Sequence, residues 1–194
     1  MAKMNYFEKL EVLSQLAYDA VCLACGEKKQ LSKRENDAGY NLPEMRTECD
    51  RILCELENSL FTDFIPPLER DNIAAYAHCL SRVVERALEH RANYPEKAVT
   101  RKNEEGSVCV RLADEIRKNT QLLRSLRKNE KQPDAGRFRE LLKEGRDAHS
   151  AMMAKMNSGS FPHSYAQMII STGRLRLELS RCFDELVEIM LNNI

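Results

Sequence analysis

The sequence predicts an all-α protein of six long helices, arranged as two consecutive antiparallel three-helix bundles. Apolar residues recur at three- and four-residue steps in six segments, and none shows the two-residue alternation of a strand. Charged residues make up 31% of the 194-residue chain and aromatic residues only 6%, which is typical of long helices with a solvent-facing side. We expect bundles at residues 1–94 and 95–194, either separate or merged into one compact domain.

The first two predicted helices span about residues 5–28 and 43–60. A polar stretch rich in turn-forming residues, QLSKRENDAGYNLP, separates them. Pro43 suits the first turn of the second helix, where a missing N–H has no cost.

The third predicted helix opens after Pro66 and Pro67, which cannot continue a preceding helix but are tolerated in the first turn of the next. Glu69 and Asp71 would then lie near the positive end of its dipole. The side chains expected to face the core are Ile73, Tyr76, Ala77, Leu80, Val83, Val84, Ala87 and Leu88. Those expected to point outward are Arg82, Arg86 and Glu89.

The last three predicted helices span about residues 107–128, 134–157 and 163–192, with Gly106 in the loop before the first of them. The linkers KNEKQPDAG and NSGSFP separate them. Four methionines in the last two helices are interpreted as core filler, with an adaptable partner surface as the alternative: Met152, Met153, Met156 and Met168.

Charge and hydropathy exclude several classes of protein. Lys plus Arg and Asp plus Glu number 30 each, so no net field attracts the chain to nucleic acid or to an anionic membrane. The first 25 residues carry acidic side chains among their apolar ones, unlike a signal peptide, and no apolar run is long enough to span a membrane. We expect a cytoplasmic protein that reaches a membrane only through a partner.

The seven cysteines, an odd number without an export signal, indicate reduced thiols. Cys22 and Cys25 form a C-x-x-C motif, which occurs in redox sites and as half of a zinc site. There is no second such motif, so packing or a helix end is the favoured interpretation.

Catalytic and cofactor motifs are missing from the sequence. It contains no G-x-G-x-x-G, Walker A or G-x-S-x-G motif, so we expect neither enzymatic activity nor a bound cofactor. The histidines lack the spacing of a helical metal site and are interpreted as satisfied or surface residues: His78, His90, His149 and His163.

The stretch LFTDFIPPLERDNIAAYAHCLSRVVE resembles the junction between the second and third helices of PhoU-like phosphate transport regulators, most closely their short, permease-linked branch. The residues that match the family's order are Phe64, Pro67, Glu69, Arg70, Asp71 and Ile73. The resemblance implies two antiparallel three-helix bundles in a row, no catalytic activity, and acidic surface patches that can hold metal clusters.

Those patches use acids four residues apart on adjacent helices, because residues i and i+4 share a helix face. In the second helix the expected pair falls at Arg46 and Asp50, which are better explained as an ion pair. In the third helix the expected acids fall at Ser81, Arg82 and Glu85, which leaves one carboxylate.

The second half of the chain retains no larger share of the expected acids than the first half. Asp114 is present, but Val110 lies four residues before it, and Asp184 is followed by Val187 where another acid is expected. We therefore expect no metal, and the remaining candidate ligands are Asp50, Glu85, Asp114 and Asp184.

The resemblance implies an accessory protein that regulates phosphate transport by binding a phosphate permease or a phosphate-signalling protein. It would act in the cytoplasm or peripherally at the inner face of the membrane. One alternative is a diverged helical scaffold that binds another partner, and a metal-binding helical bundle is the other. Whether the chain forms a homo-oligomer is left open.

Overall fold

A computed structural model describes residues 5–26, 41–63, 66, 68–93, 104–124, 135–159 and 165–192. Within these ranges the chain is all α-helical and has no strand, which confirms the predicted fold class. The six helices are α1 (Tyr6–Ala24), α2 (Leu42–Thr62), α3 (Arg70–Ala92), α4 (Glu104–Leu122), α5 (Ala135–Asn157) and α6 (Ala166–Asn192).

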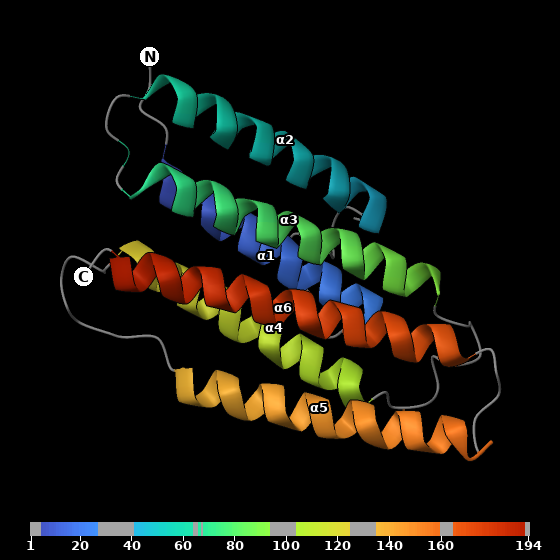
Figure 1. Cartoon of the computed structure of the whole chain (residues 1–194). Helices are drawn as coiled ribbons and strands as arrows, with labels where there is room; N and C mark the ends of the chain where they lie inside the picture. Colours follow the sequence, from blue (N-terminus) through green and yellow to red (C-terminus); the bar gives the residue numbers. More distant parts are fainter. Residues whose placement is uncertain are drawn as a thin grey trace.

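The helices lie roughly along one direction, with α2 and α5 on opposite edges of the molecule (Figure 1). Helix α3 packs against α6, α1 and α2, and α4 packs against α1, α5 and α6. One continuous hydrophobic core draws residues from all six helices, so the two three-helix halves share their interior. On the α5 side, the rings of Phe138 and Phe183 stack with centroids 3.7 Å apart.

The N-termini of the first two helices are capped by asparagines, because an asparagine oxygen can accept from a free first-turn N–H. The Asn5 side chain accepts from the backbone N–H of Glu8 at 3.2 Å. Asn41 and Glu44 form a reciprocal capping box at the start of α2. Pro43 lies in that first turn, as predicted.

Helix α3 begins at Arg70, which corrects the prediction that the prolines form its first turn. The residue before a proline is disfavoured in helical conformation, so Pro66 cannot start the helix; Pro67 lies outside the described residues. Glu69 is the N-cap residue, with an extended ψ of 134°. Asp71 lies in the first turn, as expected.

Helix α4 begins at Glu104, three residues earlier than predicted. Gly106, expected in a loop, is therefore buried in its first turn. Helix α1 ends at Ala24, before the predicted end, and Gly26 follows with a φ of 81°. The predicted ends at Lys28 and Lys128 lie outside the described residues, as does the predicted start of α6 at His163.

Over the described part of the chain, no helix combines the length and the apolar character that crossing a membrane requires.

Candidate functional site

The α2–α3 surface carries the positions at which the family resemblance places metal ligands. Arg46 donates from Nε to the Asp50 carboxylate at 3.1 Å, which confirms the predicted ion pair. The same guanidinium reaches across to α3, where Nη1 donates to the carbonyl and the Oγ of Ser81 at 3.3 and 3.4 Å. The Arg46 guanidinium, a permanent cation, therefore occupies one of the expected ligand positions and contacts two others, Asp50 and Ser81.

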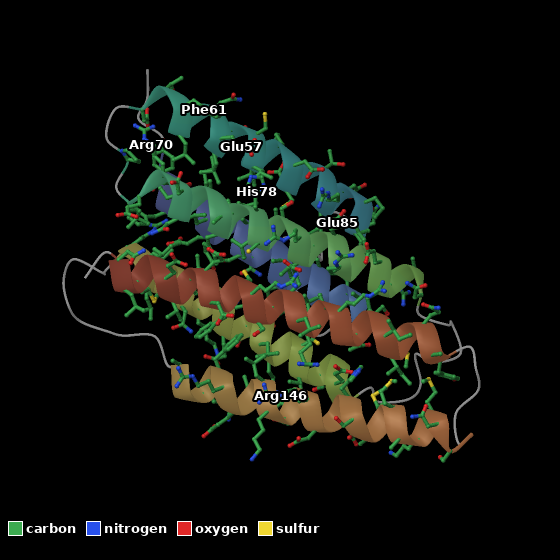
Figure 2. All side chains as sticks on the ribbon, in the orientation of Figure 1. Glu57, Phe61, Arg70, His78, Glu85 and Arg146 are labelled. Carbon is green, nitrogen blue, oxygen red and sulfur yellow. The ribbon has the colours of Figure 1, made fainter. Side chains whose placement is uncertain are left out.

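Glu85 lies one turn beyond Ser81, exposed on α3 (Figure 2). No hydrogen bond or ion pair joins it to Asp50 in the described structure. Cys49, on the buried side of the same α2 turn, is a protonated thiol because burial raises its pKa to about 11. Among the described residues, no three His, Cys, Asp or Glu side chains are grouped so that they could hold a metal ion.

The two candidate ligands of the second half lie in different environments. Asp114 is half-buried and forms ion pairs with Arg117 at 2.5 Å and Lys118 at 2.6 Å. Burial opposes its ionisation, but the hydrogen bonds from Lys118 and Arg117 outweigh it and lower the pKa of Asp114. The Arg117 guanidinium carbon lies 5.0 Å from the centre of the Tyr18 ring on α1. Asp114 therefore supports the α1–α4 contact.

Asp184 is exposed on α6 and makes no ion pair with another described residue. The valines that interrupt the acid pattern face inward, since Val110 is buried and Val187 packs against the core. An acid at either position would point toward apolar neighbours rather than toward a shared surface site.

The exposed edge of α2 and α3 presents an aromatic side chain beside polar ones (Figure 2). Phe61, near the end of α2, is 88% exposed. One turn earlier, Glu57 lies 3.0 Å from Nε2 of His78 on α3. This edge therefore places a solvated aromatic ring beside hydrogen-bonding groups.

The α2–α3 junction is held by residues from three segments. The Arg70 guanidinium donates to the carbonyls of Leu60 and Asp63, two of the unpaired carbonyls at the end of α2. Tyr6 of α1 donates from its hydroxyl to the Asp63 carboxylate at 2.7 Å. Burial and this hydrogen bond raise the pKa of Tyr6 well above its usual range. Arg70, one of the residues that carry the family resemblance, therefore holds the start of α3 against the end of α2.

Arg82 is exposed as predicted, but its role differs from that of a solvated side chain. Its Nε donates to the buried carboxylate of Glu178 on α6 at 2.6 Å, and Arg181 lies 3.3 Å from the other oxygen. The pair links α3 to α6 across 96 residues of sequence. Helical spacing gave no signal of this contact, because it depends on how α3 and α6 pack.

A buried charged cluster in the second half was also missed by sequence reasoning. Glu105 of α4 is fully buried and accepts from Nε of Arg176 at 3.1 Å, while Nδ1 of His149 lies 2.9 Å from its other oxygen. A Cβ at Gly145 would come within 2.6 Å of the Arg176 side chain, and one at Gly173 within 2.7 Å of His149. Glycines inside helical patterns were the available signal of these close approaches.

Five of the seven cysteines are buried, whereas Cys25 is half-buried and Cys54 is exposed. Cys22 is buried and Cys25 is the C-cap of α1, which confirms the helix-end interpretation of the C-x-x-C motif. Burial raises the pKa of Cys79 to about 11 and keeps Cys109 and Cys182 protonated, so these thiols are poor nucleophiles. His90 is buried with Nδ1 2.9 Å from Oγ of Ser171.

No family model matches the chain, and no curated protein matches it in sequence. Its fold is similar to two crystal structures from Shewanella oneidensis. One, described as a PhoU-like phosphate regulatory protein, superposes with a TM-score of 0.74 and 13% identity, over 98% of this chain and 100% of that one. The other, described as a PhoU-like protein, gives a TM-score of 0.71 and 13% identity, with 96% and 99% covered. The chain therefore has a PhoU-like helical-bundle fold.

Proposed function

We propose that the chain is an accessory protein of phosphate transport that regulates a phosphate permease, or a phosphate-signalling protein, by binding to it. The observation that carries this proposal is the full-length similarity to a structure described as a phosphate regulatory protein. The similarity extends over both halves of the molecule. It is therefore not limited to a single three-helix bundle, which many unrelated proteins contain.

Binding rather than catalysis is the activity that the side chains support. The buried thiols are protonated, and the buried carboxylates of Glu105 and Glu178 are neutralised by Arg176 and Arg82. None of these groups is poised as a nucleophile or as a general base. Long exposed helix faces, by contrast, offer the area that a protein partner needs.

The exposed edge of α2 and α3 is the surface that we assign to the partner. Phe61 supplies a large apolar ring on a rigid helix, and Glu57 with His78 supplies polar groups beside it. Aromatic anchors surrounded by polar groups contribute much of the binding energy in protein interfaces. Arg70 holds the end of α2 in place and so orients Phe61.

The proposed location is the cytoplasm, with membrane association only through the permease. The formal net charge of zero supports this, because the chain lacks the basic excess that attracts proteins to anionic lipid.

Affinity co-purification from native membranes tests the proposal. The wild-type chain should recover a phosphate permease or a phosphate-signalling protein, and Phe61→Ala should reduce recovery at least fivefold without changing the circular dichroism spectrum. Arg146→Ala, an exposed truncation on the opposite edge of the molecule, is the matched control and should recover the partner normally (Figure 2). Recovery of an unrelated protein in place of either partner would favour the diverged scaffold.

A further inference from the structure

The outer face of α6 carries a regular row of exposed aliphatic side chains. Ile170, Leu177 and Leu191 are 36%, 53% and 69% exposed. They are separated by one and two seven-residue steps, and Asp184 occupies the step between the last two. Residues at seven-residue spacing form one seam when two helices pack side by side. In Figure 1, α6 lies in front of α4, and no helix lies in front of α6.

The charged residues on this seam are divided by sign along the helix. Arg174 and Arg181 lie in its N-terminal part, and Asp184 and Glu188 lie in its C-terminal part. Arg174, Asp184 and Glu188 make no ion pair with another residue of the described structure. Arg181 reaches the edge of the buried Glu178 carboxylate at 3.3 Å, yet its side chain remains 71% exposed.

We propose that this seam binds a second copy of the chain, with the two α6 helices antiparallel about a two-fold axis. An antiparallel pair sets the basic part of each helix against the acidic part of the other, so the same favourable contact forms twice. A parallel pair would instead set Arg174 against Arg174 and Glu188 against Glu188.

The pairing of Arg174 with Glu188 selects the register within the antiparallel arrangement. When Ile170 lies opposite Leu191 of the second copy, Arg174 lies within about one residue's rise, ~1.5 Å along the axis, of Glu188 of that copy. Arg181 is then about one helical turn from Asp184 of the second copy, within reach of its long side chain. In this register Leu177 lies opposite Asp184 of the second copy. Shifting one helix by a heptad in either direction separates Arg174 from Glu188 of the second copy by about 9–12 Å along the axis, and one of the two shifts also sets Asp184 against Asp184.

The dimer should form reversibly. The overlap from Ile170 to Leu191 is about 32 Å long at ~1.5 Å per residue, and a contact between two single helices lies near the lower limit of about 1,000 Å² for specific interfaces. The seam is on α6, away from the α2–α3 edge assigned to the permease, so self-association and partner binding are separate properties of the molecule.

Sedimentation velocity on the full chain, across the micromolar concentration range, tests the proposal. The wild-type chain should show a concentration-dependent monomer–dimer equilibrium. Arg174→Glu and Glu188→Arg should each weaken dimerisation at least tenfold, because each places like charges opposite one another twice. An equimolar mixture of the two variants should restore it, because the mixed dimer has opposite charges at both contacts.

Arg146→Glu on α5 is the control, since it changes charge by the same amount on an exposed residue outside the seam, and it should dimerise like the wild-type chain. Circular dichroism should show that all variants keep their helical content. A wild-type chain that stays monomeric throughout, single variants that dimerise normally, or a mixture that stays monomeric would each overturn the proposal.

Discussion

Arg46 determines the electrostatics of the α2–α3 surface. Its guanidinium stays charged at any physiological pH and is held by Asp50 and Ser81, so a divalent cation approaching this surface meets a fixed positive charge. The Arg46–Asp50 pair was predictable, because residues four apart share a helix face. The Ser81 contact was not, because it joins residues 35 apart and depends on the packing of α2 against α3.

We predict that the purified chain carries no stoichiometric iron or zinc. Repulsion by Arg46 and the dispersal of the four candidate carboxylates leave no compact set of oxygen ligands on the described helices. Elemental analysis of protein purified without chelators checks this. About one equivalent of metal per chain, lost in the double variant Asp50→Ala with Glu85→Ala, would show that the acidic positions do form a site.

His90 makes stability depend on pH. Burial, with a smaller effect of Arg91, lowers its pKa to about 4 from an ordinary value of 6.5. The unfolded chain therefore binds a proton that the folded chain does not, in the range between these two values. The resulting stability is present above about pH 6.5 and is lost as the pH falls toward 4, by up to ~3 kcal/mol.

We predict that His90→Gln flattens the decline of the free energy of unfolding between pH 6.5 and 4. Urea denaturation at several pH values measures this. The slope of the free energy of unfolding against pH is compared between variants, rather than its absolute value. His78→Gln, at an exposed histidine, is the control and should change the slope much less. If His90→Gln left this slope unchanged, His90 would not be the source of the pH dependence.

Gly145 leaves room for the buried Glu105–Arg176 pair. A Cβ there would lie 2.6 Å from Cδ of Arg176 and 3.2 Å from a methyl of Val108. Alanine improves helix propensity by about 1 kcal/mol, but overpacking costs typically ~1–3 kcal/mol and here also strains a buried ion pair. We predict that Gly145→Ala lowers the melting temperature. Gly136→Ala, exposed on the same helix, should leave it unchanged or raise it. A rise for both variants would contradict the close packing at Gly145.

The helices themselves were largely predictable from apolar periodicity, whereas their ends were not. Helix α3 starts later than predicted because Pro66 precedes another proline, which disfavours helical conformation there, and because Glu69 has an extended ψ. Helix α4 starts earlier because Glu105 is drawn into the interior by Arg176 and His149. Local composition indicated a loop around Gly106, and contacts with residues far along the chain overrode it.

Arg70 connects the end of α2 to the start of α3. We predict that Arg70→Ala lowers the free energy of unfolding by ~1–3 kcal/mol, because two carbonyls lose a charged donor. Arg70→Lys should restore only part of this, since an ammonium lacks the guanidinium's fork of donors. Glu69→Ala, at an N-cap that makes no capping hydrogen bond, is the control for urea denaturation. Equal decreases in the free energy of unfolding for Arg70→Ala and Glu69→Ala would contradict the role given to Arg70.

The six helices form one molecule with a shared core rather than two isolated bundles. Sequence periodicity predicted which residues are buried, but the cross-connections between halves came only from the structure: the Arg82–Glu178 pair and the packing of α3 on α6. Helical spacing identifies neighbours one turn apart, and it carries no signal for side chains that meet across 96 residues.

We propose that this chain, which has a PhoU-like fold, regulates phosphate transport by binding a partner. Phosphate uptake in a deletion strain, measured across phosphate concentrations and complemented with the wild-type chain, Phe61→Ala or Arg146→Ala, tests it most directly. We predict altered uptake, or altered repression of uptake, in the deletion strain. The wild-type chain and Arg146→Ala should correct this defect, and Phe61→Ala should not. Normal uptake in the deletion strain at every phosphate concentration would contradict the claim.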